Sequence, residues 1–439
     1  MNYWLEHCRP PRERPENLTW DVFISYRSID RRWAIALHDM LSQAGYEVFL
    51  DQYVLVPGKE LDIQLGENLN ASASGVLVWS TRAADSTWVK GEYSSMAARY
   101  RDCHSSFPFH FVVAVLDGHK PPGLSGGHLF LDFSEYPDGP MGADLVRLTC
   151  ALSGFPLPAA AVSRISEFEQ NLHEMTRRVR TLGNIGNHKE LYDLVTSDDP
   201  VFTTSATLPG LAIEQMIAGA HYDHALRALT TAMGRFPRSM RLRQLRGLAL
   251  RRSGKLEEAR ECMDQLYQDS ARDTETLGIY AAVEADRWEQ LNQEGREREA
   301  RDALEHSRSL YKQAFEMEPT DYYTGINAAS KSALLKEFPL ARKLADQVLK
   351  VLDDVEQKRN ISNNEYWEQA TRAEALLLKG DHEQAVKQFH EARIAHAEKK
   401  GSIATTGTQV RRLLCVLDVP EPSRRLLLEE FDIDASAIQ

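Results

Sequence analysis

The segment Asp85–Met96, DSTWVKGEYSSM, places Trp88 and Glu92 four residues apart in a mostly polar run. That spacing puts two side chains on the same face of a helix, one turn apart. A glutamate in the first turn of a helix is usually a solvated residue that the helix dipole favours. The same carboxylate in a crevice would stabilise a developing cation or accept a proton. The elements around Glu92 decide between these two interpretations.

Four elements are expected to bring side chains to the same place as Glu92. Tyr26 ends a first apolar run, Phe49–Asp51 end a second, and Ser80 ends a third. Glu92 begins a helix one loop after that third run. The carboxyl ends of parallel strands meet at one edge of a sheet, where α/β proteins bind ligands. The order of the elements therefore predicts one crevice lined by all four.

Short runs rich in β-branched and aromatic residues alternate with helix-period segments through the first 155 residues. The expected strands are residues 20–26, 46–51, 74–80, 109–116 and 128–133. The expected helices between and after them include residues 31–45, 61–72 and 88–102. Such alternation predicts a parallel sheet covered on both faces. Five strands in about 135 residues are typical of a flavodoxin-like α/β layout.

Composition excludes several other classes of protein. The 439 residues carry a formal net charge of −12, which disfavours binding to nucleic acid or to an anionic membrane surface. The five cysteines are scattered, so neither a disulfide framework nor a zinc site is expected, and we predict no metal. No apolar run approaches the length of a membrane span, and no secretory signal opens the chain. The expected compartment is the cytoplasm.

The ordered set of motifs in residues 18–155 resembles the TIR (Toll/interleukin-1 receptor) domain. DVFISYRS is similar to the first-strand signature, and SASGVLVWS is similar to the third strand. FLDQYVLVPGKEL is similar to the second strand and the loop after it, including the Pro57-Gly58 turn. Trp88 and Glu92 match the Trp-x-x-x-Glu of the enzymatic members. The resemblance implies a five-stranded parallel sheet.

Many TIR domains are NAD⁺ glycohydrolases, whereas others only assemble, and the resemblance places Glu92 at the catalytic glutamate of the enzymes. It also assigns Tyr26 and Arg27 to the dinucleotide, through stacking and phosphate charge. Phe49, Ser80 and Trp88 would line the pocket. The sequence departs from the family at Gly91, which costs helix stability just before the glutamate, and at Val89, where plant members often have cysteine.

The implied chemistry needs one carboxylate. Cleavage of the nicotinamide–ribose bond gives an oxocarbenium-like ribose, which a carboxylate below the sugar stabilises. The carboxylate also accepts the proton of the attacking water or hydroxyl. The pyridinium nitrogen leaves neutral, so no general acid is required. NAD⁺ is thus a substrate and no cofactor is expected, and both a linear and a cyclic ADP-ribose product stay open.

After the Pro- and Ala-rich stretch 154–163 the sequence shows helix periodicity and almost no strand signal. Ala225 and Ala259 recur 34 residues apart in similar segments, and Ala385 occupies the same place in a third. This pattern resembles the tetratricopeptide repeat, an array of antiparallel helix pairs. Residues 280–311 predict an extended helix pair inserted between repeats. The later part also resembles the helical TRAF-binding region of some MAP kinase kinase kinases, which we take as a fold label only.

These patterns predict an N-terminal extension, a TIR domain, a connecting segment, an all-α tetratricopeptide-like solenoid and a tail. The expected ranges are 1–17 for the extension, 18–155 for the TIR domain, 156–205 for a linker and connecting helix, 206–420 for the repeats and 421–439 for the tail.

Two functions of different classes follow from the resemblance. The first is a self-assembling NAD⁺ nucleosidase, hydrolase or cyclase, acting in bacterial antiphage immunity, with the loop of Pro57 and Gly58 driving assembly. Its expected partners are copies of itself, through the TIR domain or the repeats, and an unknown protein or small-molecule trigger at the repeats. The alternative is a TIR scaffold that oligomerises and recruits partners without turnover. Glu92 discriminates between them, and the sequence leaves open whether the repeats activate or inhibit.

Overall fold

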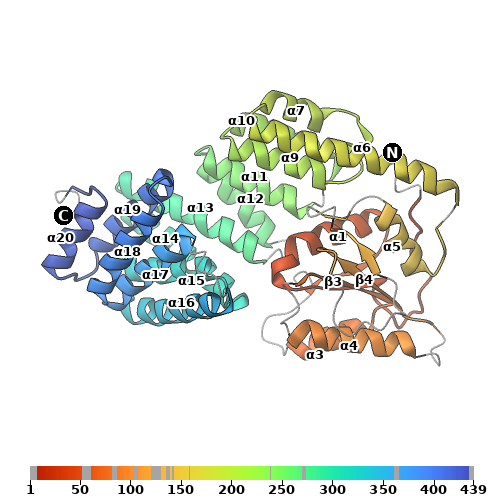
Figure 1. Cartoon of the computed structure of the whole chain (residues 1–439), viewed down its shortest axis with the longest axis horizontal. Coiled ribbons are helices and arrows are strands. Elements are labelled where there is room, and N and C mark those ends of the chain that lie inside the picture. The colour runs from red at the N-terminus through yellow and green to blue at the C-terminus, as the bar shows by residue number, and fades with distance from the viewer. Residues whose placement is uncertain are drawn as a thin grey trace. The chain divides into compact units, whose positions relative to one another are not determined.

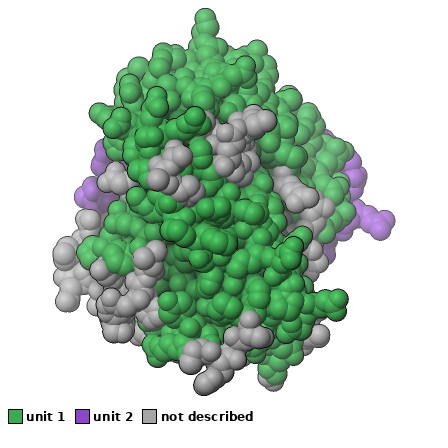
Figure 2. Space-filling model, turned by 90° about the vertical axis from the view of Figure 1, so that its right-hand side faces the viewer, with its two compact units in different colours: residues 1–272 green, residues 273–439 purple. Residues whose placement is uncertain are grey.

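The computed structural model of the chain is drawn in Figure 1. It describes residues 7–51, 61–81, 87–102, 107–119, 130–134, 139–140, 143–157, 159–237, 239–268, 273–359 and 365–434. The chain divides into two compact units, residues 1–272 and residues 273–439 (Figure 2). Within the described ranges, no helix combines the length and the apolar character that crossing a bilayer requires.

A five-stranded sheet, entirely parallel, forms the centre of the first 155 residues. Its spatial order is β2-β1-β3-β4-β5. The strands are β1 (Val22–Ser25), β2 (Val48–Phe49), β3 (Ser74–Trp79), β4 (His110–Val115) and β5 (Phe130–Asp132). Almost every residue of β1, β3 and β4 is buried, as expected for a parallel sheet covered on both faces. The predicted flavodoxin-like sheet is confirmed.

Helices cover both faces of this sheet (Figure 1). On one face lie α1 (Arg31–Gln43) and α5 (Ala143–Ser153), and on the other lie α3 (Leu61–Asn70) and α4 (Thr87–Arg101). Successive strand residues point to opposite faces. Phe23 and Leu77 accordingly pack in one apolar cluster with Met96 of α4. Because Ser25 lies two residues after Phe23, its side chain points to this same α3/α4 face.

The strand order changes direction between β1 and β3. From β1 the chain proceeds to β2 on one side, and it then returns to β3 on the other side of β1. Ligands of open α/β sheets bind in the crevice that such a reversal leaves at the carboxyl ends of the strands. Ser25 ends β1 and Trp79 ends β3, so the residues that follow them border this switch point.

The first unit continues into a helical region. Its helices are α6 (Ala159–Asn184), α7 (His188–Thr196), α8 (Pro200–Thr203), α9 (Thr207–Ala218), α10 (Tyr222–Arg235), α11 (Met240–Arg252) and α12 (Leu256–Gln268). The stretch 154–163, expected to be a linker, is in fact helical from Ala159 onward. The alanines after it explain the difference, because alanine has the highest helix propensity.

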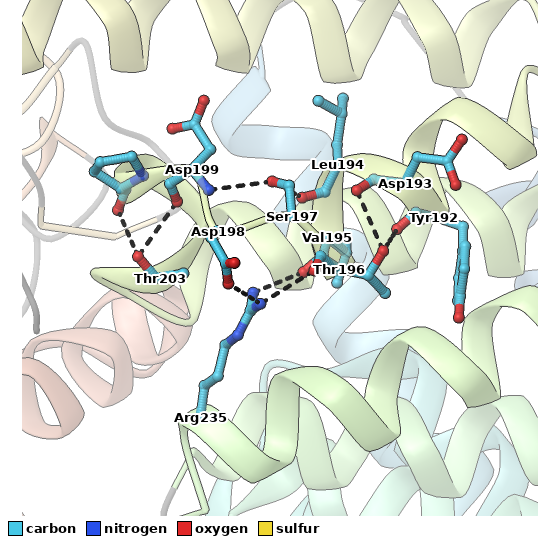
Figure 3. Close-up of polar contacts among 11 residues, drawn as sticks. Tyr192, Asp193, Leu194, Val195, Thr196, Ser197, Asp198, Asp199, Thr203 and Arg235 are labelled. Carbon is cyan, nitrogen blue, oxygen red and sulfur yellow. Dashed lines mark hydrogen bonds and ion pairs between the residues drawn. The ribbon is translucent and has the colours of Figure 1, made fainter.

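Arg235, the last residue of α10, closes the C-terminal end of α7 (Figure 3). Its guanidinium donates to the carbonyl oxygens of Val195 and Thr196 at 2.9 and 3.2 Å. It also lies 3.6 Å from a carboxylate oxygen of Asp198. The last carbonyl groups of a helix have no partner within the helix, and a cation there also complements the helix dipole. Arg235 therefore fixes the turn between α7 and α8 to the body of the repeats.

The second unit is helical throughout the part that the structure describes. Its helices are α13 (Thr274–Gln293), α14 (Glu297–Met317), α15 (Tyr322–Leu334), α16 (Phe338–Arg359), α17 (Tyr366–Lys379), α18 (His382–Ala395), α19 (Lys400–Leu414) and α20 (Glu421–Glu430). The long helices α13 and α14 form the extended helix pair predicted for residues 280–311. The repeat alanines Ala225, Ala259 and Ala385 are fully buried. The segment expected to be a tail contains α20.

Candidate functional site

Glu92 lies in the second turn of α4, and its half-buried carboxylate faces the end of β1. The hydroxyl of Ser25 donates a hydrogen bond to Glu92 Oε2 at 2.5 Å. Ser25 itself is buried, with 2% of its surface exposed. This contact fixes the carboxylate beside the switch point between β1 and β3. The sequence reasoning missed Ser25, although its place at the end of β1, in step with the inward-facing Phe23, was a usable signal.

Tyr26 joins the end of β1 to the end of β2. Its hydroxyl donates to Asp51 Oδ1 at 2.7 Å and also hydrogen-bonds with Arg31 at the start of α1. Burial and the negative charge of Asp51 raise the pKa of Tyr26 well above its ordinary value. Tyr26 is therefore a neutral phenol at physiological pH. Its hydroxyl has partners on both the β2 and the α1 sides, Asp51 and Arg31.

Hydroxyl–carboxylate hydrogen bonds also connect the end of β3 to the turn after β1 and to the end of β4. Ser80, which is nearly buried, donates to Asp30 Oδ2 at 2.7 Å. The backbone N–H and the hydroxyl of Thr81 both donate to Asp117 Oδ2 at 2.6 Å. Partial burial works against ionisation of Asp117, but the hydrogen bonds from Thr81 outweigh it and lower its pKa. Pairs of a hydroxyl and a carboxylate thus connect neighbouring strand ends from β2 to β4.

Arg27 is half-buried in the turn that follows β1. Its carbonyl oxygen accepts a hydrogen bond from the backbone N–H of Asp30 at 2.8 Å, and the 3₁₀ helix η1 (Ser28–Asp30) begins directly after it. The hydrogen bond between Ser80 and Asp30 ties this turn to the end of β3. Arg27 is therefore carried by a fixed turn at the same edge as Glu92.

Phe49 ends β2, but the structure does not expose its side chain at this edge. Its ring is fully buried and stacks on Phe23, with centroids 4.9 Å apart, while Trp20 packs edge-on against it at 5.7 Å. Phe49 is a core residue in this structure. Trp88 stands in the first turn of α4, but its side chain is not among those described. Pro57 and Gly58 also lie outside the described residues.

Trp79, the last residue of β3, carries a polar group without a hydrogen-bond partner among the described residues. Its indole is 4% exposed and Nε1–H is buried. Trp20, in the same layer of side chains, donates its own indole N–H to Asn68 Oδ1 at 3.0 Å. Buried tryptophan N–H groups usually have an acceptor, and leaving one without an acceptor costs about 1–3 kcal/mol. The Trp79 N–H is therefore a buried, unsatisfied donor at the end of β3.

Within the described ranges, no three His, Cys, Asp or Glu side chains are grouped so that they hold a metal ion. The site as described thus consists of one carboxylate, a row of hydroxyl–carboxylate pairs, an arginine and a free indole donor. This set fits the stabilisation of a cation beside an anionic ligand.

Comparison with known proteins identifies two families in the chain. Residues 22–147 match the TIR domain, and residues 221–335 match the Tetratricopeptide Repeats-Sensor family. The chain therefore combines a TIR domain, which contains the candidate site, with tetratricopeptide-like helical repeats.

Two curated relatives match the TIR part. "Probable 2′ cyclic ADP-D-ribose synthase BdTIR" of Brachypodium distachyon is 30% identical over 114 residues, which are 26% of this chain and 50% of that protein. "Disease resistance protein RUN1" of Vitis rotundifolia is 30% identical over 151 residues, which are 33% of this chain and 11% of that protein. The chain thus spans half or less of the length of these relatives.

A solved structure, a thermophilic TPR protein of Thermus thermophilus, is 17% identical to this chain with a TM-score of 0.37. The match covers 47% of this chain and 99% of that one.

Proposed function

We propose that the TIR domain cleaves NAD⁺ between nicotinamide and ribose, with Glu92 as the catalytic carboxylate. The observation that carries this proposal is the hydrogen bond from Ser25 to Glu92, because it holds a half-buried carboxylate at the switch point of the sheet. The Brachypodium relative is named a probable 2′ cyclic ADP-D-ribose synthase, which supports a reaction on the same class of substrate.

In the proposed reaction the bond between ribose C1′ and the pyridinium nitrogen breaks, and its electron pair goes to the nitrogen. Nicotinamide leaves as a neutral molecule, so no acid has to protonate it. The ribose becomes oxocarbenium-like, and the Glu92 carboxylate stabilises this positive charge. A water molecule or a hydroxyl of the ADP-ribose moiety then attacks C1′ and loses its proton to Glu92. The first nucleophile gives a linear product and the second a cyclic one.

The remaining residues of the site bind the substrate in this proposal. Arg27 supplies charge and paired N–H donors for the pyrophosphate, which the geometry of a guanidinium suits. Tyr26 offers its ring for stacking, since its hydroxyl is bound to Asp51. Ser80 and Trp88 would line the pocket beside them. Phe49 supports the pocket from the core and does not contact the substrate directly.

The proposal extends to assembly and context. Self-association would order the loop of Pro57 and Gly58 and complete the site, and the protein would act as a cytoplasmic immune effector of the antiphage kind. A bulky residue in place of Gly58 should then reduce both light scattering by assemblies and turnover. Normal assembly with lost turnover would mean that the loop acts on the substrate and not through assembly. The likeness to MAP kinase kinase kinases stays a prediction about the fold.

The decisive experiment follows the fluorescence of etheno-NAD⁺, which rises when nicotinamide leaves, with concentrated full-length protein. We expect turnover by the wild type and its loss in Glu92→Gln, which keeps the size of the side chain and removes its charge. Glu67→Gln, on the exposed side of α3 in the same layer, is the matched control and should retain turnover. Absence of cleavage by the assembled wild type would instead favour the non-catalytic scaffold.

A further inference from the structure

The helical repeats of the first unit pack directly on helix α1 of the TIR domain. One face of α1 carries Arg32, Ala36, Asp39, Met40 and Gln43, which recur at helical spacing. This face lies against α9 and α11 through Ala206, Thr207, Gly210, Glu214, Ser239 and Arg241. We call this contact the α1 seam. It encloses a cavity of about 20 Å³, room for one water molecule.

One carboxylate joins three helices at the outer end of the seam. Glu214 of α9 accepts a hydrogen bond from Arg32 Nη2, at the start of α1. The same oxygen, Oε1, lies 2.9 Å from Nε and 2.8 Å from Nη2 of Arg241, at the start of α11. The side chains of Glu214 and Arg241 are each 20% exposed, and that of Arg32 is 44% exposed. Glu214 therefore bridges the TIR domain and the repeats.

A buried carboxylate anchors the middle of the seam. Asp39 is 6% exposed and accepts hydrogen bonds from the backbone of Met240 and the hydroxyl of Ser239, which caps α11. A negative charge is favourable at the N-terminal end of a helix. Nearby, Gly139 has a positive φ of 142°, and a Cβ atom there would lie 2.8 Å from both Ala36 and Thr207. The seam has no space for an additional side chain at this point.

The first turn of α1 connects this seam to the candidate site. Arg31 hydrogen-bonds with Tyr26, whereas the next residue, Arg32, binds Glu214. Neighbouring residues on a helix point about 100° apart, so the first turn of α1 contacts both the candidate site, through Arg31, and the repeats, through Arg32. The residue before this turn, Asp30, accepts the hydrogen bond from Ser80 at the end of β3. A displacement of Arg32 would therefore reach both Tyr26 and the turn that carries Arg27.

We propose that Arg32 is a positioning residue: through Glu214 the repeats hold the first turn of α1 where Arg31 and Asp30 shape the substrate site. This inference rests on the proposed NAD⁺ cleavage for its effect on turnover, but not for its effect on structure. Ion pairs with an exposed partner contribute little to global stability. The expected signature of losing Arg32 is consequently local, at residues 26–33, and not a general loss of folding.

The test compares two arginines that share one acceptor. Arg32→Ala should lower kcat for etheno-NAD⁺ about three- to tenfold and speed amide hydrogen exchange in residues 26–33, with an unchanged melting temperature. Arg32→Lys, which keeps the charge, should restore most of the rate. Arg241→Ala removes a positive charge from the same carboxylate but leaves the ion pair between Arg32 of α1 and Glu214 in place, and it should change kcat less than about twofold.

Equal effects of Arg32→Ala and Arg241→Ala, or unchanged exchange in residues 26–33, would overturn the proposal. A faster reaction in Arg32→Ala would overturn it too, because the seam would then restrain the site. If the wild type does not cleave NAD⁺, the proposed function fails, and the exchange experiment still tests the seam. If Arg32→Ala does not fold, the same measurements are made on Glu214→Gln instead. This variant keeps the shape of the shared acceptor and removes its charge.

Discussion

The two faces of the TIR sheet hold carboxylates in opposite ways. On the α3/α4 face, Glu92 is half-buried and has the hydroxyl of Ser25 as a donor at the open edge of the strands. On the α1/α5 side, Asp39 is nearly buried and is held by the first residues of α11. The first arrangement leaves a charge where a substrate can meet it, and the second uses a charge to join two parts of the chain. Burial and the identity of the donors, rather than the residue type, separate a chemical role from a structural one.

The same isosteric change on the two faces should give the largest contrast. Glu92→Gln should lower NAD⁺ turnover at least about tenfold, equivalent to 1.4 kcal/mol of transition-state stabilisation, and leave the melting temperature unchanged. Asp39→Asn should affect stability and leave most of the turnover. Steady-state rates and thermal melts of both variants check this. Retained turnover in Glu92→Gln would contradict the catalytic assignment, and neither carboxylate would then have a chemical role.

The next contrast concerns the donor that holds Glu92. Ser25→Ala should lower kcat about tenfold, because a hydrogen bond to a charged group contributes about 1.5–3 kcal/mol and here orients the carboxylate. Ser25→Thr keeps the hydroxyl on a strand residue and should recover activity. Measurement of kcat and KM for all three proteins separates orientation from binding. An unchanged kcat in Ser25→Ala would show that Glu92 does not depend on this contact.

The two tryptophans of the α3/α4 face sharpen the comparison further. Trp79→Phe removes the donor without a partner and should raise KM about fivefold, near 1 kcal/mol, with a smaller effect on kcat. Trp20→Phe removes a donor that binds Asn68 and should reduce stability while leaving KM as it is. Substrate titrations and thermal melts of both variants are the measurement. Equal KM values in the wild type and Trp79→Phe would contradict a role for the free N–H.

The smallest expected effect is the pH dependence of the seam. Burial raises the pKa of Asp39, and hydrogen bonds from His38, Met240 and Ser239 offset this only in part. The pKa of Asp39 in the folded chain lies above its ordinary value of 3.8. At pH values between these two pKa values the folded chain binds more protons than the unfolded chain, so stability falls as the pH rises through this range. Asp39→Asn does not titrate. Its melting temperature relative to the wild type should therefore be higher at pH 7 than at pH 4.5.

His38 Nδ1 lies 3.3 Å from Asp39 Oδ1, so the experiment is repeated in a His38→Gln background. A difference in melting temperature that does not change with pH would show that Asp39 binds protons equally in the folded and the unfolded chain over this range, which contradicts a raised pKa. The measured pH dependence thus reports the difference in the pKa of Asp39 between the folded and the unfolded chain.

The sequence by itself determined the sheet and the place of Glu92. Runs of β-branched residues separated by helix-period segments allow few arrangements, because a parallel strand must be buried on both faces and reached by a crossover helix. Loop order then places the residues after β1 and β3 at one edge. The repeat alanines were equally visible, since close helix crossings admit only small side chains and recur at a fixed period.

Only the tertiary structure decided which side chains meet. Phe49 and Trp79 both end strands and both lie in one buried apolar cluster, and only the structure shows that the indole N–H of Trp79 has no partner among the described residues. The sequence indicates only that Ser25 ends β1 in step with Phe23, and the packing of α4 on that face brings its hydroxyl to Glu92. The α1 seam was invisible for a physical reason: its face carries Arg32, Asp39 and Gln43, which hydrophobic periodicity assigns to solvent. Polar residues become interface residues when donors and acceptors distant in the sequence complement them, and that matching exists only in the folded chain.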